Sequence, residues 1–226
     1  MKIHFYAHAS FRIESKDVVI VTDPYTPGPA GSNFAPIDEP ADIVLMSSAV
    51  DPFHSDPSHV TEKPLIIDAV DIPPEGIDAL GVPIRAYQTM ESETWDYGER
   101  DAEPNAMYWF EIEGVRCFHM GDLGNPISPE HIDQLRGEVD VMFALAGGQP
   151  TIALPDLVQA IDAIGPKIVI PMHFYSPKGV LKILPLEEFT GLYPEDVVTF
   201  VRGSDLEVTR DSLPESMHIY VLKQSR

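Results

Sequence analysis

Apolar residues in this chain gather in short runs that end at proline, glycine, serine or aspartate, a pattern typical of buried β-strands. Phe11 and Ile13 alternate with polar neighbours, and Ser15 to Asp17 resembles a turn. Lys2 to Glu14 and Val18 to Thr22 therefore predict a hairpin. Further strands are expected at Ile43 to Met46, Pro64 to Ile67, Val82 to Thr89, Ala106 to Ile112, Val115 to His119, Val139 to Leu145, Lys167 to Ile170, Val197 to Val201, Leu206 to Thr209 and Ile219 to Leu222.

Helix signals are concentrated in the second half of the chain. Ser128 followed by Pro129 predicts an N-cap and first turn for a helix through about Leu135. The segment from Pro155 to Ile164 has apolar residues at helical spacing and ends at Gly165, and Pro185 to Leu192 predicts a third helix. Pro24 to Pro40 has no periodicity and is expected to be a long surface loop that covers a pocket.

Length and composition favour one compact domain over residues 1–226, because 44% of the 226 residues are hydrophobic and neither a repeat nor a linker interrupts the chain. The formal net charge of -21 disfavours nucleic acid and anionic membrane surfaces as partners. The first residues alternate like a strand and no apolar run is long enough to cross a bilayer, so a cytoplasmic protein is expected. The single cysteine, Cys117, lies in an apolar strand and is interpreted as a buried structural thiol.

Two side chains that can bind metal follow predicted strands. Asp122 comes after the strand that ends at His119, and His173 comes after the strand near Ile170. The carboxyl ends of strands are where sites in α/β proteins are usually built. Asp122 and His173 therefore predict half of a metal site.

The order of motifs resembles the metallo-β-lactamase superfamily, and within it small bacterial and archaeal hydrolase-like proteins related to ascorbate-6-phosphate lactonase. The residues that carry the resemblance are Tyr6 to Phe11, Thr22 to Pro24, His119 to Gly124, Gly147-Gly148 and Ile170 to Phe174. The resemblance implies an α+β fold, a four-layer αβ/βα sandwich of two mixed sheets with helices outside. It also implies a site at the sheet edge between the two halves.

The chain departs from that family where most of the metal ligands are expected. A His-x-His-x-Asp-His motif follows the corresponding strand in the family, whereas this chain has Ser48, Val50, Pro52 and Phe53 at the four positions. A further family histidine is replaced here by Glu91. Because a catalytic zinc ordinarily takes three protein ligands, a dinuclear site is not expected.

Other residues can be recruited to complete a mononuclear site. His54 lies one residue past the motif, Glu91 offers oxygen ligands, and Asp51 is another nearby acid. A set of His54, Glu91, Asp122 and His173 suits one zinc, manganese or iron ion. The competing interpretation makes His54 and His59 solvated loop residues and places Glu91 on an acidic surface loop.

Four further residues are candidates for the pocket itself. The resemblance places His8 and His119 close to the pocket, where an imidazole can orient a ligand, move a proton or hydrogen-bond a buried carbonyl. Asp23 corresponds to a carboxylate that supports metal-bound histidines in the family, but here a structural hydrogen bond is favoured. Ser48, or its neighbour Ser47, is the nucleophile of a metal-free alternative that lacks a Gly-x-Ser-x-Gly elbow.

Two main functional hypotheses remain. The favoured one is a non-hydrolytic descendant that has largely lost its metal site, holds no cofactor tightly and binds a small molecule. The alternative is an atypical mononuclear hydrolase of a small ester, lactone or phosphoester that uses Asp122, His173 and a recruited His54 or Glu91. Without a cation, Asp122 is expected to show a raised pKa or to pair with charged His173 or His119. The apolar strands at both ends of the chain leave a homo-oligomer open.

Overall fold

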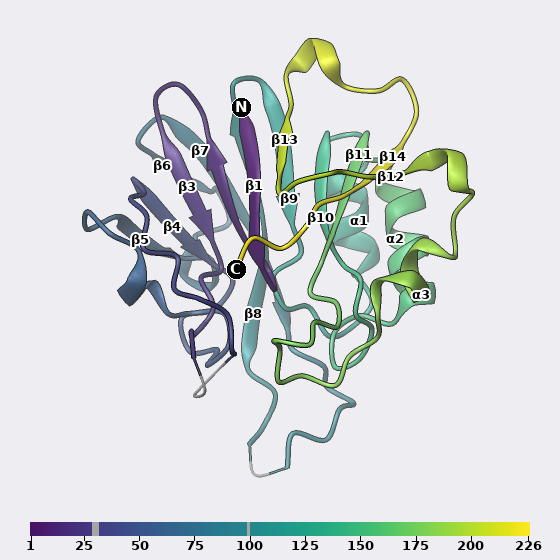
Figure 1. The fold of residues 1–226 in the computed structure, drawn as a ribbon, viewed down its shortest axis with the longest axis horizontal. Helices are drawn as coiled ribbons and strands as arrows, with labels where there is room; N and C mark the ends of the chain where they lie inside the picture. The colour runs from purple at the N-terminus through teal and green to yellow at the C-terminus, as the bar shows by residue number, and fades with distance from the viewer. Residues whose placement is uncertain (29–31, 99) are drawn as a thin grey trace.

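The computed structural model describes residues 1–28, 32–98 and 100–226, whose strands form two mixed sheets (Figure 1). The six-stranded sheet has the order β13-β1-β2-β3-β4-β5, and the eight-stranded sheet has the order β12-β14-β11-β10-β9-β8-β7-β6. The first contains β1 (Lys2–Ala7), β2 (Ser10–Glu14), β3 (Val19–Thr22), β4 (Ile43–Met46), β5 (Leu65–Asp68) and β13 (Asp205–Glu207). The second contains β6 (Ile77–Ala79), β7 (Val82–Met90), β8 (Pro104–Ile112), β9 (Val115–His119), β10 (Val141–Leu145), β11 (Ile168–Met172), β12 (Val198–Phe200) and β14 (His218–Val221).

The predicted strands are present, with bounds that shift by one or two residues in most of them. Two features differ from the prediction. The stretch from Lys2 to Glu14 is two antiparallel strands, because the chain reverses at His8 and Ala9. The short strand β6 was not predicted; it pairs with β7 through the turn at Leu80 and Gly81.

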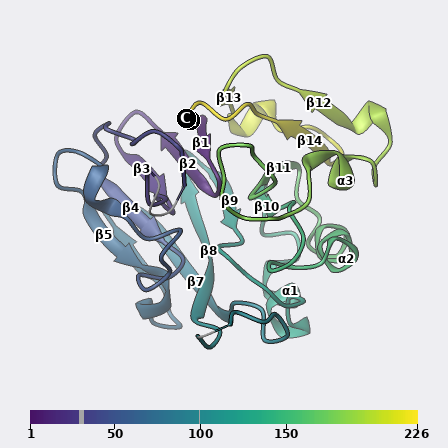
Figure 2. The ribbon, with the colours of Figure 1, turned by 60° about the horizontal axis from the view of Figure 1, so that its bottom comes forward.

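The three predicted helices are α1 (Pro129–Leu135), α2 (Leu154–Ile164) and α3 (Leu186–Thr190). The Ser128 hydroxyl accepts a hydrogen bond from the His131 N–H and caps α1, as expected. All three helices lie on the same side of the molecule, next to β10 and β11 (Figure 2). Within the described residues, no helix has both the length and the apolar character that crossing a bilayer requires.

Apolar packing divides into two clusters of buried side chains. The larger cluster joins both sheets and includes Phe5, Phe11, Phe110, Phe118 and Phe143. The smaller one lies on the opposite face of the six-stranded sheet, since Tyr6 belongs to it while its neighbour Phe5 belongs to the larger cluster. Tyr25, Phe34 and Ile37 of the predicted loop pack there. These side chains cover the outer face of the six-stranded sheet, and no α-helix of the described residues before Pro129 does so, so the expected outer helix layer is present on one side of the sandwich only.

Parallel pairing brings the functional strand ends to one edge. Strand β4 is parallel to β3 and β5, and β10 is parallel to β9 and β11. The two sheets meet at this edge through a hydrogen bond of 2.9 Å from the Ala106 N–H to the Ser47 carbonyl. The residues that follow β4, β9 and β11 are therefore close in space, although far apart in the sequence.

Candidate metal centre

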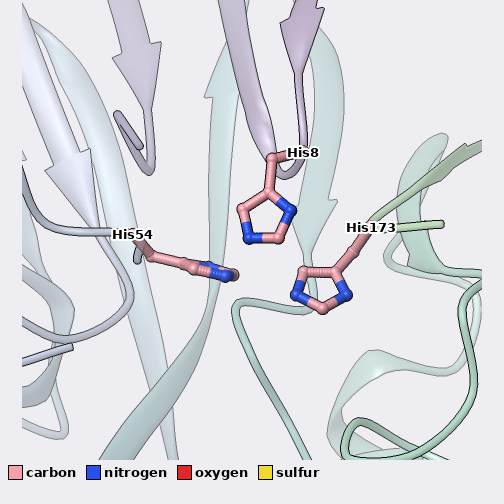
Figure 3. Close-up of side chains that lie close together, drawn as sticks. All are labelled: His8, His54 and His173. Atoms are coloured by element: carbon pink, nitrogen blue, oxygen red, sulfur yellow. The ribbon is translucent and has the colours of Figure 1, made fainter. Parts of the chain in front are cut away.

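Three buried histidines from distant parts of the chain converge at this edge (Figure 3). His8 lies in the turn between β1 and β2, His54 lies in the loop after β4, and His173 follows β11. The ring centroids of His8 and His173 are 4.2 Å apart, those of His8 and His54 are 4.5 Å apart, and those of His54 and His173 are 5.1 Å apart. One nitrogen of each ring lies within 4.8 Å of the other two.

The backbone of two of these histidines adopts the left-handed conformation. His8 has a φ of 58° and His173 a φ of 51°. The His173 N–H donates a hydrogen bond of 2.8 Å to the His8 carbonyl, which connects the two turns directly. Such backbone geometry is uncommon outside glycine and concentrates at functional sites.

Asp122 completes the cluster from the end of β9. Its Oδ1 atom lies 3.4 Å from Nε2 of His173 and 3.9 Å from Nε2 of His54. The Asp122 N–H donates to Oδ1 of Asn105 at 3.0 Å, which fixes the turn. Asp51 is also nearby, since one ligand atom each of Asp51, His54 and Asp122 lie within 4.8 Å of one another.

Five polar atoms of this cluster have no hydrogen-bond partner among the described residues. Both ring nitrogens of His54 and His173, and Oδ1 of Asp122, are buried and have no partner among the described residues. Buried polar atoms are nearly always hydrogen-bonded, so a group of unpaired ones that face each other indicates a binding site. Neutral imidazoles beside a carboxylate form a donor set that suits a metal ion.

Burial controls the ionisation of the cluster. It lowers the pKa of His8, His54 and His173, and the neighbouring imidazoles lower those of His8 and His173 further. Burial, followed by the repulsion of Glu91, raises the pKa of Asp122 to about 7. The raised pKa agrees with the expectation for Asp122 without a cation. The lowered pKa of His173 and His119 disfavours the alternative, an ion pair of Asp122 with a charged imidazole.

The spacing fits a single small cation. Ligand atoms about 2.0 to 2.2 Å from a tetrahedral metal are separated from one another by about 3.4 Å. Asp122 Oδ1 and His173 Nε2 already show that separation, and the distance to His54 Nε2 exceeds it by only a few tenths of an ångström. His54 belongs to both groups of three side chains that could hold a metal ion, one with His8 and His173 and the other with Asp51 and Asp122, so the cluster offers donors for one cation.

Glu91 is not free to act as a ligand. Its buried carboxylate accepts hydrogen bonds from Nη1 and Nη2 of Arg100 at 2.7 and 3.0 Å, and from the Glu103 N–H at 3.0 Å. The expectation that Glu91 belongs to the ligand set is therefore not supported. Glu91 is not a surface residue either, because it is 3% exposed.

His119 and Asp23 lie behind the cluster rather than in it. His119 is fully buried; its Nε2 donates to the Ala9 carbonyl at 2.9 Å, and its Nδ1 accepts from the Gly121 N–H at 3.1 Å. Burial lowers the pKa of His119 to about 3 and raises that of Asp23. Asp23 accepts a hydrogen bond of 2.6 Å from the Ser47 N–H, the structural role that was favoured. These two residues hold the ends of β4 and β9 in place.

The loop after β4, where the family motif is degenerate, still brings a histidine to the cluster. Val50 is 62% exposed, whereas His54 is 1% exposed and faces the cluster, so the interpretation of His54 as a solvated loop residue is wrong. His59 accepts a hydrogen bond from the Ile37 N–H at 2.9 Å and lies 2.8 Å from the Tyr25 carbonyl, which fixes the loop. Ser48 is buried, and no hydrogen bond connects its side chain to a histidine within the described residues.

The resemblance places His8 close to the pocket, but it does not predict that His8 lies next to His54 and His173, two histidines that could bind metal. The only local signal was polar His8 in a stretch where an uninterrupted strand was expected. Asp51 was named as a nearby acid without a defined place. The contacts of His8 with His54 and His173, and of Asp51 with His54 and Asp122, depend on how the two sheets pack. The local pattern of residues does not predict that packing.

The chain is similar to known proteins, some of which are named as metal-dependent hydrolases. The chain is 29% identical over 198 residues to a UPF0173 protein of Pyrococcus abyssi, a match that covers 79% of this chain and 86% of that protein. It is 23% identical over 190 residues to a UPF0173 metal-dependent hydrolase of Thermococcus onnurineus, with 77% and 84% of the two chains covered.

A crystal structure from Thermotoga maritima has a similar fold. It is described as a candidate Zn-dependent hydrolase of the metallo-beta-lactamase superfamily, with a TM-score of 0.73, 29% sequence identity, and coverage of 98% of this chain and 97% of that one. The hypothesis of a largely lost metal site is not supported, because the relatives are named as hydrolases and a histidine and aspartate group is present here. The relation to ascorbate-6-phosphate lactonase stays a prediction.

The family model of the beta-lactamase superfamily domain matches residues 2–173, which include His8, His54, Asp122 and His173. That match covers most of the chain, and the two-sheet fold agrees with it. The chain belongs to the metallo-β-lactamase superfamily.

Proposed function

We propose that this protein is a hydrolase that depends on one divalent metal ion, held by His54, His173 and Asp122. The observation that carries the proposal is the set of buried, unpaired ligand atoms that face each other at this edge. The names of the relatives support the same class of activity. Zinc, manganese and iron all accept such a mixture of nitrogen and oxygen ligands.

A divalent cation at this position would polarise a carbonyl or phosphoryl oxygen and lower the pKa of a water molecule. With three ligands assigned, the neutral imidazole of His8 is left free beside the reaction centre. We assign it the role of accepting a proton from the attacking water and returning it to the leaving group. Burial lowers the pKa of His54, and the carboxylate of Asp51 opposes that shift, so the ring is a more basic ligand than burial alone would leave it. The substrate is a small ester, lactone or phosphoester.

The first test is the metal content of protein purified without chelators or metal-affinity tags. We expect about one equivalent of zinc, manganese or iron in the unmodified protein, and a loss of most of it in Asp122→Ala, because that change removes one of three ligands. Asp133→Ala is the matched control, since Asp133 is an exposed acid on α1, and it should keep the metal.

Elemental analysis by mass spectrometry gives the stoichiometry. An unmodified protein without stoichiometric metal would contradict the proposal, and so would equal metal in Asp122→Ala. Hydrolysis of small esters and phosphoesters should be lost together with the metal.

A further inference from the structure

Asp23 and His119 form a fully buried pair behind the candidate metal centre, with Nδ1 of His119 lying 3.3 Å from Oδ2 of Asp23. Nε2 of His119 contacts the Ala9 carbonyl in the β1–β2 turn, and its Nδ1 contacts the Gly121 N–H in the turn after β9. Oδ1 of Asp23 accepts from the Ser47 N–H, just after β4. The pair therefore joins the three segments that carry His8, His54 and Asp122.

The hydrogen-bond partners of His119 determine where its proton lies. A backbone carbonyl only accepts, so Nε2, which is 2.9 Å from the Ala9 carbonyl, carries a hydrogen. A backbone N–H only donates, so Nδ1, which is 3.1 Å from the Gly121 nitrogen, presents its lone pair. The imidazole is therefore neutral, with its single hydrogen on Nε2.

The neutral ring determines the protonation of Asp23. An ionised carboxylate only accepts, so it would place an oxygen lone pair 3.3 Å from the lone pair of His119 Nδ1. A protonated carboxyl instead donates from Oδ2 to that nitrogen. Its Oδ1 still accepts from the Ser47 N–H at 2.6 Å, and its Oδ2 still accepts from the Tyr108 hydroxyl at 3.2 Å. The protonated form thus satisfies every contact of the pair.

The surroundings of Asp23 also disfavour a charge. The ionisable groups that face it are Tyr108 on β8 and His119 on β9, and Asp51 in the loop after β4 adds repulsion. The ion pairs of lysine and arginine among the described residues do not include Asp23. Burial raises the pKa of Asp23 and lowers that of His119 to about 3. A carboxyl group in such surroundings can stay neutral at pH 7.

We infer that Asp23 is a neutral carboxylic acid that donates a hydrogen bond to His119, and that this uncharged pair positions the three segments of the metal centre. The inference goes beyond the proposed function, because it assigns a protonation state behind the site and makes Asp23 a positioning residue. This role differs from the support of metal-bound histidines by a carboxylate that the family resemblance implies. Its direct tests require neither metal nor hydrolysis.

Infrared difference spectroscopy at about pH 7 tests the protonation state. Subtracting the spectrum of Asp23→Asn from that of the unmodified protein should leave the carbonyl stretch of a protonated carboxylic acid. Asp140→Asn is the matched control, because Asp140 is also a buried aspartate but pairs with Arg116 and Arg210. Its difference spectrum should show the bands of an ionised carboxylate. The same ionised bands in the Asp23→Asn difference spectrum would overturn the inference.

The pH dependence of stability gives a second test. A carboxyl group whose folded pKa is raised loses stabilising free energy as the pH rises from its unfolded pKa of about 3.9 to the folded value. Relative to Asp23→Asn, the unfolding equilibrium constant of the unmodified protein should therefore rise by up to about tenfold per pH unit above about pH 4. Urea titrations measure this ratio. A ratio that stays constant or falls above about pH 4, as for an aspartate that is ionised when folded, would contradict the assignment.

Zinc affinity tests the positioning role. Asparagine keeps an acceptor for the Ser47 N–H and a donor for His119, whereas alanine keeps neither. We expect Asp23→Asn to bind zinc within about threefold of the unmodified protein and Asp23→Ala to bind it at least about tenfold more weakly. Equal affinities of the two variants, whether high or low, would contradict the positioning role. If the unmodified protein binds no zinc, the proposed function fails, and the infrared and urea measurements still decide the protonation of Asp23.

Discussion

His8 and His173 show how single residues shape this site. Both have left-handed backbone conformations, for which a side chain costs about 1 kcal/mol or more, and both face the same centre. Gly147 lies against His173, because a Cβ atom at Gly147 would be 2.1 Å from the His173 carbonyl oxygen. Only glycine allows the strand end after β10 to approach His173 so closely.

Gly147→Ala should therefore weaken metal binding by displacing His173. We expect at least about tenfold weaker affinity for zinc, measured by competition with a chromogenic chelator. Gly203→Ala provides the control, because a Cβ atom there meets no neighbour within 4 Å and the backbone is not left-handed. Unchanged affinity in Gly147→Ala, with a native circular dichroism spectrum, would show that the position of His173 does not depend on this contact.

At the scale of elements, amphipathic patterning and caps decide where each strand or helix ends. Helix α2 buries Leu157, Ile161 and Ile164 on one face and ends at Gly165, whose φ of 71° lies in the left-handed region. That conformation lets the Gly165 N–H bond back to the Ile161 carbonyl. The helix packs beside β10 and β11 and so supports the strand that carries His173 (Figure 2).

Gly165→Ala should destabilise the protein by about 1 kcal/mol, because alanine disfavours the left-handed conformation while the open surroundings add no steric clash. Gly165→Asn should recover part of this loss, since asparagine tolerates the conformation better. Urea denaturation at constant m-value measures both changes. Equal stability of the alanine variant and the unmodified protein would show that the left-handed conformation of Gly165 does not stabilise the end of α2.

At the scale of the whole molecule, the net charge is -21, but the buried carboxylate of Asp140 is paired with two arginines. Asp140 accepts hydrogen bonds of 2.9 and 3.0 Å from Arg116 on β9 and of 2.8 Å from Arg210 near the C-terminus. Burial raises the pKa of Asp140, but the hydrogen bonds and charge of Arg116 outweigh it, and the net effect is a lowered pKa. This carboxylate joins the second sheet to the C-terminal segment.

Asp140→Asn should lower the free energy of unfolding by about 2 kcal/mol at neutral pH, because charged hydrogen bonds are lost. An aspartate with a lowered folded pKa contributes stability above its unfolded pKa of about 3.9 and loses it as the pH falls through the folded value. The difference between the two proteins should therefore persist to about pH 4 and shrink below it. Urea titrations from pH 8 to pH 3 measure it, with Asp133→Asn, an exposed acid, as the near-neutral control. A difference that grows on acidification would contradict this assignment.

The sequence by itself determined the elements other than β6 and the importance of Asp122 and His173, because strand periodicity, caps and strand-end residues are local signals. The α+β class came from the resemblance of its motifs to a known family. The tertiary structure decided the partners of those two residues. The path of the loop after β4 places His54 in the cluster, and the reversal of the backbone between β1 and β2 places His8 there. The carboxylate of Glu91 is instead hydrogen-bonded to Arg100. The neighbours of these residues depend on which loops meet when the two sheets pack. No single segment of the sequence contains that information. The sequence lacks the four residues of the family motif, and packing places other residues that could bind a metal near the same place.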